Sequence, residues 1–139
     1  MIEYTKILTY LKEMLESDLD TTRIQIEPTL VGDTSFTTEV GISLTETKRV
    51  ERSLGASDPY ETTLSIDVLC SAYNPDGMYE ACVSRDALIG KVETILKKDR
   101  TLGDLVGATR LDGVTFQTAE TEAGYFSGGV IKFAAIIMA

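Results

Sequence analysis

Apolar residues recur every three or four positions from Tyr4 to Leu15, which predicts an amphipathic helix over this segment. Lysines and glutamates occupy the opposite side of that helix. Short polar residues from Ser17 to Asp20 favour a turn, so we expect the helix to end there. The apolar positions of the predicted helix are Tyr4, Ile7, Leu8, Leu11, Met14 and Leu15.

The next region is rich in threonine and β-branched residues, which favour strands. Arg23–Glu27 alternates between apolar and polar positions, and Pro28 ends this short predicted strand. Phe36–Thr47 is predicted to be a second strand. The polar segment Lys48–Asp58 is then either a loop or the tip of a long hairpin.

Tyr60–Tyr73 carries the clearest strand pattern, since apolar and polar residues alternate over more than ten positions. We expect one face of this strand in the core and the other exposed or covered by a second subunit. Leu69 and Tyr73 are apolar residues on the otherwise polar side, which favours contact with a partner there. The core-facing positions are Leu64, Ile66, Val68, Cys70 and Ala72.

After Asn74-Pro75, apolar residues recur at helical spacing as far as Leu96, with Arg85 as an interruption. This pattern predicts a second helix of about 22 residues, or about 33 Å. Asn74 suits the N-cap of this helix and Pro75 its first position, where a missing N–H has no cost. Lysines and an arginine follow its end, where cations complement the helix dipole.

Turn-forming residues from Thr101 to Gly107 predict a connector between the second helix and the last two strands. Ala108–Ala119 is predicted to be a strand, unless Asp112-Gly113 forms a tight hairpin turn. Glycines at positions 124, 128 and 129 predict a turn around Tyr125 and Phe126, followed by a final strand from Val130 to about Met138.

The predicted order α-β-β-β-α-β-β indicates an α+β fold over residues 1–139, as a single domain. We expect a two-layer sandwich, with a largely antiparallel or mixed sheet of four to five strands. Each predicted helix has one apolar stripe, so both helices should pack on the same face of the sheet.

Composition narrows the chemistry that the chain can perform. The 139 residues include no histidine, which excludes catalytic triads and histidine metal ligands. No phosphate-binding or calcium-binding loop is present. The paired acids Asp18 with Asp20 and Glu120 with Glu122 fall in predicted turns, where solvated acids are common. We therefore expect no enzyme activity, no catalytic residue, no cofactor and no metal.

The charge and hydropathy of the chain limit the kinds of partner that it can bind. With 22 acidic and 13 basic residues the net charge is -9, which disfavours binding to nucleic acid or to anionic membranes. Cys70 and Cys82 are expected to be buried apolar residues. The N-terminus lacks a signal-peptide pattern, and the longest apolar run, Ala134–Ala139, is far shorter than the ~20 residues of a membrane span, which predicts a cytoplasmic protein at synthesis.

Several features together resemble one family. The N-terminal helix is followed by a strand that ends at Pro28, a central strand ends in Ser71-Ala-Tyr-Asn-Pro75, and the long helix leads into Ile95-Leu-Lys-Lys-Asp-Arg-Thr-Leu-Gly103. Over nearly the whole chain this pattern resembles the tail terminator family of long-tailed bacteriophages, also called tail completion or minor tail proteins. The segments Lys48–Asp58 and Gly124–Gly129 have no counterpart in that pattern.

The resemblance implies a structural virion protein, assembled in the host cytoplasm, that forms a hexameric ring at the head-proximal end of the tail tube. Such a ring ends tube polymerisation and presents the surface that joins the head. The implied partners are further copies of the chain, the tail tube protein and a head-completion or neck protein. DNA would pass through the lumen without specific binding, which an acidic inner surface would favour.

Six residues are predicted to make interfaces on this hypothesis. The cations Lys48, Arg49 and Arg52 lie in a protruding segment, Tyr60 begins the central strand, and Tyr125 and Phe126 form either a core plug or an exposed anchor. Two alternatives stay open. One is a head-completion or neck connector protein, and the other is a small cytoplasmic ligand-binding or enzymatic domain that uses carboxylates.

Overall fold

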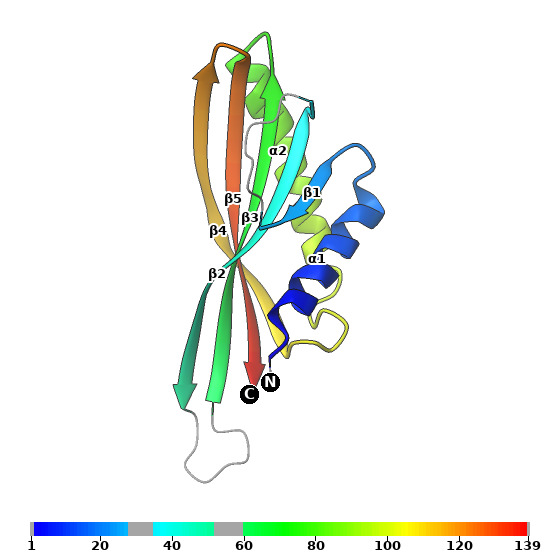
Figure 1. Ribbon diagram of the computed structural model, residues 1–139, viewed down its shortest axis with the longest axis vertical. Coiled ribbons are helices and arrows are strands. Elements are labelled where there is room, and N and C mark those ends of the chain that lie inside the picture. The colour runs from blue at the N-terminus through cyan, green and yellow to red at the C-terminus, as the bar shows by residue number, and fades with distance from the viewer. Residues whose placement is uncertain (1, 28–34, 52–59, 139) are drawn as a thin grey trace.

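The computed structural model describes residues 2–27, 35–51 and 60–138, which form two helices and a five-stranded sheet (Figure 1). This is the α+β class, and the element order confirms the order predicted from the sequence. The elements are α1 (Tyr4–Asp18), β1 (Arg23–Ile26), β2 (Thr38–Glu51), β3 (Tyr60–Asn74), α2 (Met78–Leu96), β4 (Ala108–Thr121) and β5 (Gly124–Met138).

The strands are ordered β1-β2-β3-β5-β4 across the sheet. β1 runs parallel to β2, and the other neighbours are antiparallel, so the sheet is mixed. β5, the last strand in the chain, lies between β3 and β4 (Figure 1). β1 and β4 are therefore the edge strands, and β1 covers only the first part of β2.

Both helices pack on one face of the sheet and form a single core with it. The apolar stripe of α1 is buried at Ile7, Leu11 and Leu15, as its spacing predicted. On β3 every second residue from Thr62 to Ala72 is buried, which confirms the alternation in the sequence. Side chains from β2 and β5 complete this layer, including Val40, Ile42, Ile131 and Phe133.

The opposite face of the sheet, which we call the open face, has no helix over it in the part of the chain that the structure describes. Strong twisting of the sheet turns its two ends in different directions. In Figure 1 the strands run β4, β5, β3, β2 from left to right at the top, and β2, β3, β5 at the bottom. The open face of the upper end therefore points away from the open face of the lower end.

The hairpin formed by β2 and β3 extends further than the two strands predicted from the sequence. β2 continues through Lys48, Arg49 and Val50, which are paired with Thr63, Thr62 and Glu61. The first part of the segment Lys48–Asp58 is thus strand, as the hairpin interpretation expected. Residues 52–58 of that segment lie outside the described residues.

The predicted start of the second helix is wrong by about three residues. Asn74 ends β3, and its Oδ1 accepts hydrogen bonds from the backbone N–H groups of Asp76 and Gly77. This side-chain turn uses the residues that the sequence pattern assigned to the first helical turn, so Gly77 becomes the N-cap and α2 has 19 residues.

Of the predictions about the last strands, one is confirmed and one is wrong. β4 continues through Asp112 and Gly113, as the strand prediction expected, and the alternative hairpin turn is replaced by a bulge, where the pairing with β5 shifts and Gly113 has a φ of +147°. Tyr125 and Phe126 are not in a turn, because β5 begins at Gly124 and includes them. The turn between β4 and β5 is only Glu122 and Ala123.

Candidate functional site

Three of the predicted interface residues gather at the lower end of the sheet. Lys48 and Arg49 are exposed on β2, and Tyr60 begins β3 with 44% of its surface exposed. In Figure 1 this end of β2 and β3 extends beyond both helices. Because neighbouring strand residues alternate between faces, Lys48 lies on the open face and Arg49 on the helix-bearing side.

Apolar residues accompany these cations. Val50 and Met138 are exposed by 48% and 52%, and both are in register with Glu61, so they flank it on the open face. We call this end of β2, β3 and β5 the tab, defined by Lys48, Arg49, Val50, Tyr60 and Met138. Exposed apolar side chains beside cations are typical of contact surfaces.

The other two described candidates lie at the opposite end of the sheet, on β5. Phe126 lies on the open face and its ring centroid is 4.9 Å from that of Tyr73. Tyr125 lies on the helix-bearing side of the same strand, and both residues are half-buried. Tyr73 also donates a hydrogen bond of 2.5 Å to the carbonyl of Ala123, which fixes the β4–β5 turn.

Beside Phe126 the open face is hollowed into a shallow apolar groove of about 150 Å³. Gly128 has no side chain, and this leaves the space open. A β-carbon at this position would meet Leu69 Cδ1 at 3.5 Å, an ordinary contact distance. We call this hollow the upper groove. It is lined by Leu69, Ser71, Gln117, Thr118, Ala119, Phe126, Gly128 and Val130.

Acidic residues lie at the same end of the sheet as the upper groove, outside its lining. Asp76 lies in the β3–α2 turn, Glu120 ends β4 and Glu122 lies in the β4–β5 turn, and all three are exposed. Neither turn contains a lysine or an arginine. These three residues therefore give this end of the molecule a locally negative charge.

The six predicted interface residues thus divide between two surfaces. Lys48, Arg49 and Tyr60 are together on the tab, Tyr125 and Phe126 are beside the upper groove, and Arg52 lies outside the described residues. Sequence reasoning missed Val50, Met138 and Val130, because only the strand register shows which residues share a face with the candidates.

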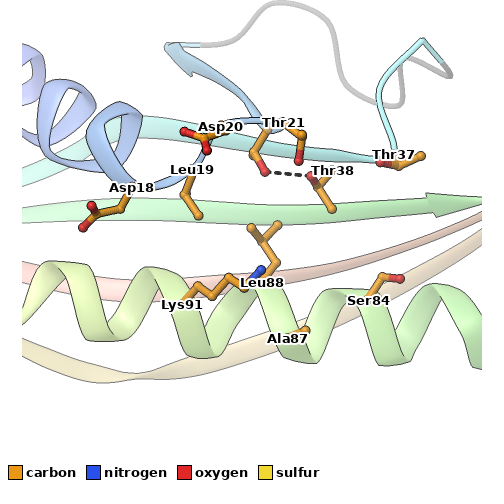
Figure 2. A pocket seen from close by; sticks show the side chains of 11 residues that line it. Asp18, Leu19, Asp20, Thr21, Thr37, Thr38, Ser84, Ala87, Leu88 and Lys91 are labelled. Atoms are coloured by element: carbon orange, nitrogen blue, oxygen red, sulfur yellow. Dashed lines mark hydrogen bonds between the residues drawn. The ribbon is translucent and has the colours of Figure 1, made fainter.

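A second hollow, of about 420 Å³, separates the α1–β1 turn and the start of β2 from α2 (Figure 2). Hydroxyl groups dominate it, and the Thr22 and Thr38 hydroxyls are 2.7 Å apart. Lys91 contributes an ammonium group from α2, while the Asp18 carboxylate accepts a hydrogen bond from Lys98 at 2.7 Å. The lining residues are Asp18, Leu19, Asp20, Thr21, Thr22, Thr37, Thr38, Ser84, Ala87, Leu88 and Lys91.

Arg85, which interrupts the apolar stripe of α2, is held between the helix and the sheet. Its guanidinium donates to the Ser127 hydroxyl at 2.8 Å, pairs with Asp86 at 2.9 Å and lies 4.7 Å from the ring centre of Phe116. The Cys82 sulfur lies 3.3 Å from the same hydroxyl. Cys82 is only half-buried, so its predicted full burial is wrong, because it faces this polar cluster.

Cys70 is fully buried, as predicted, and burial raises the pKa of its thiol to about 12. A thiol with that pKa stays protonated at neutral pH, which makes it a poor nucleophile. Within residues 2–27, 35–51 and 60–138, no three side chains of the metal-binding types gather at one place.

The Asp99 carboxylate organises the connector after α2. It accepts hydrogen bonds from the Tyr10 hydroxyl at 2.5 Å and from the backbone N–H groups of Thr101 and Gly103. The Tyr10 hydrogen bond, helped by the other donors, lowers the pKa of Asp99, and the same bond raises the pKa of Tyr10. This contact ties α1 to the connector and is structural.

Comparison of the chain with models of known protein families finds no match, and a search of curated proteins finds no relative. The resemblance to tail terminators therefore rests on element order and the quoted motifs. None of the helices in the described part combines the length and apolar character that crossing a membrane requires.

Proposed function

We propose that the protein is a structural component of a phage virion. On this proposal it forms a ring, of six copies, at the head-proximal end of a tail tube, where it ends tube polymerisation and presents the head-joining surface. The observation that carries the proposal is the open face, which no helix covers along the described sheet. It bears the exposed side chains of Val50 and Met138 at one end and the apolar groove beside Phe126 at the other. Large exposed apolar surfaces on small folded domains mark contacts with other proteins.

Two separate contact surfaces suit a subunit that must touch neighbours of more than one kind. The tab and the upper groove lie at opposite ends of β3, whose 15 residues extend about 50 Å. Further copies of the chain, the tail tube protein and a head-completion or neck protein are the proposed partners. The net charge of -9 suits a ring through which DNA slides without binding.

The test combines the purified protein with tail tubes from long-tailed phages that lack their own terminator. Negative-stain microscopy should show a cap on one end of each tube, and tubes capped in this way should no longer elongate. Binding to portal-containing heads, with no binding to tubes, would favour a neck connector instead. Absence of binding to either structure would contradict a virion role.

A small-molecule binding domain is the second candidate, and the hydroxyl-lined hollow of Figure 2 is the observation that favours it. Threonine and serine hydroxyls with one ammonium group suit a polar ligand such as a polyol. Native mass spectrometry of protein purified from its host would detect a retained ligand. Loss of that mass on Thr38→Val and Lys91→Ala substitution would place the ligand in this hollow.

A further inference from the structure

We propose that the outer stripe of α2 packs against the same stripe of a second copy, with the two helices antiparallel. The outer stripe consists of residues that share the side of α2 opposite the core, namely Tyr79, Val83, Ala87, Gly90 and Thr94. A contact between two copies of one surface closes after two copies. This pairing is therefore a further contact of the chain, separate from the contact that would build the proposed ring.

The outer stripe is exposed along its whole length, although it carries no charge. Tyr79 and Val83 are exposed by 77% and 51%, and the other three residues are exposed as well. The Thr94 hydroxyl donates to the Gly90 carbonyl at 2.9 Å, so its donor is satisfied within the helix. A helix that is apolar on all sides is normally covered on all sides. The outer stripe is the side of α2 that the described residues leave uncovered.

The outer side of α1 has a different character. α1 packs on the same face of the sheet, and its exposed residues include Lys6, Glu13 and Glu16. Charges therefore recur along the side of α1 that faces water, as they do on most surface helices. The uncharged stripe of α2 contrasts with this pattern and indicates that a second protein surface covers it.

Gly90 is the member of the outer stripe that contacts within the chain explain least. Glycine lowers the stability of a helix interior more than any other residue except proline. A β-carbon at position 90 would meet no neighbouring group within 4 Å, so packing within the described chain does not require glycine there. Glycine does allow the backbone of another segment to approach closely. Gly90 and Ala87 thus form a place where a second helix can cross α2.

Charged residues at the two ends of the stripe identify a second copy as the partner. Glu80 lies at the N-terminal end of α2, while Lys97 and Lys98 follow its C-terminal end, and all three are exposed. About 18 residues complete five helical turns, so Lys97 is in line with Tyr79 and Lys98 is in line with Glu80. The helix dipole favours acids at the start and bases at the end of any helix, but it does not favour an uncharged stripe between them.

An antiparallel second copy brings these opposite ends together. When the helices cross at the middle of the stripe, Glu80 lies opposite Lys98 of the other copy, and Tyr79 lies opposite Lys97 of the other copy. The first contact is an ion pair, and the second places an ammonium group beside an aromatic ring. Lys98 can keep its 2.7 Å hydrogen bond to Asp18, because an ammonium group has three hydrogens to donate. Two-fold symmetry makes each contact occur twice.

The first test is Gly90→Lys in the full chain. This lysine places two ammonium groups at the crossing point, so we expect self-association to weaken about a hundredfold in sedimentation equilibrium. The Tm of the monomer should rise by a few degrees, because lysine is a better helix former than glycine. The matched control is Thr9→Lys, which adds the same charge at an exposed position of α1 and should leave association unchanged.

The second test concerns the orientation of the two helices. Glu80→Lys places ammonium groups opposite Lys98 on both sides of the pair, so we expect dimerisation at low salt to weaken about tenfold. Addition of Lys98→Glu to the same chain restores opposite charges across an antiparallel pair and should restore dimerisation. In a parallel pair residue 80 would face residue 80, and neither variant would change the association. The Tm of each variant, measured where the chain is monomeric, checks that the fold is kept.

Three results would overturn the inference. They are a natural chain that stays monomeric at hundreds of micromolar, a dimer that Gly90→Lys leaves intact, and orientation variants that both associate like the natural chain. Tube capping by the same variants tests the proposed ring separately, so a dimer that never caps a tube would refute the ring and leave this pairing intact. A monomeric chain that loses tube capping on Gly90→Lys would overturn the pairing and assign the outer stripe to the tube protein.

Discussion

A steep loss of stability is expected from any side chain at Gly124, where the β4–β5 turn contacts the β3–α2 turn. Gly124 has a φ of +139°, which side chains other than hydrogen disfavour. A β-carbon there would lie 2.8 Å from Pro75 Cα and 3.0 Å from the carbonyl oxygen of Asn74. Both are backbone atoms, so a change of rotamer cannot relieve the overlap.

We expect Gly124→Ala to lower the free energy of unfolding by about 2–6 kcal/mol, since backbone strain and overpacking each cost roughly 1–3 kcal/mol. In a domain of this size each kcal/mol corresponds to roughly 3–5 °C in Tm, so the Tm should fall by roughly 6–30 °C. Urea unfolding followed by circular dichroism measures the same loss as a lower midpoint with an unchanged slope.

Gly128→Ala is the matched comparison, on the same strand. Its β-carbon would meet Leu69 Cδ1 at 3.5 Å, an ordinary contact. We expect a change within about 1 kcal/mol, towards stabilisation, because alanine restricts the unfolded chain more than glycine does. Equal losses in the two variants would refute the reasoning, since they would show that glycine is needed for strand geometry in general and not for the contact with Pro75.

Three further predictions concern groups described above. The lowered pKa of Asp99 stabilises the fold above the unfolded-state pKa of about 3.9, and this stability is lost as the pH falls through the folded-state pKa. The raised pKa of Tyr10 has the opposite pH dependence, because its contribution to stability is lost as the pH rises through the folded-state pKa of Tyr10. Tyr10→Phe should therefore flatten both flanks of a plot of Tm against pH, and an unchanged profile would contradict the assignment. A thiol reagent at neutral pH should label Cys82 and leave Cys70 unlabelled until urea is added, with Cys82→Ser removing the native signal, because only Cys82 is accessible. Arg85→Lys should cost about 1–2 kcal/mol in urea unfolding, because an ammonium group cannot donate to Ser127, pair with Asp86 and stack on Phe116 together, whereas a loss as small as that of the exposed Lys91→Ala would argue against this cluster.

Local patterns were enough to predict the layers of this fold. The alternation in β3 and the stripe of α1 each report burial on one face, and burial on one face is what a two-layer sandwich requires. The errors fall where a distant element decides the local structure. Gly129 suggested a turn, but it lies within β5, where the missing side chain leaves room for Ile89 of α2. That close approach involves a residue far away in the sequence, so no local pattern predicts it.

The candidate site was only partly predictable for a similar reason. Lys48, Arg49 and Tyr60 stand out in the sequence as charged or aromatic residues in a polar stretch. Met138 joins them only because β5 pairs with β3 over its whole length, which places it in register with Glu61. The upper groove depends on Leu69 and Gly128 meeting across two strands, and pairing of that kind is settled by the whole fold.

The central position of β5 has a consequence for how the molecule is made. β3 and β4 both depend on β5 for a neighbour, yet β5 follows them in the chain. On the ribosome, the earlier strands are synthesised before their shared partner exists, and β3 waits with one edge exposed. We therefore expect slow completion of folding, since the pairing of Glu61 with Met138 joins residues far apart in sequence. A nascent chain stalled before Gly124 would leave one edge of β3 unpaired and β4 without any neighbouring strand, and would be the species most prone to aggregate.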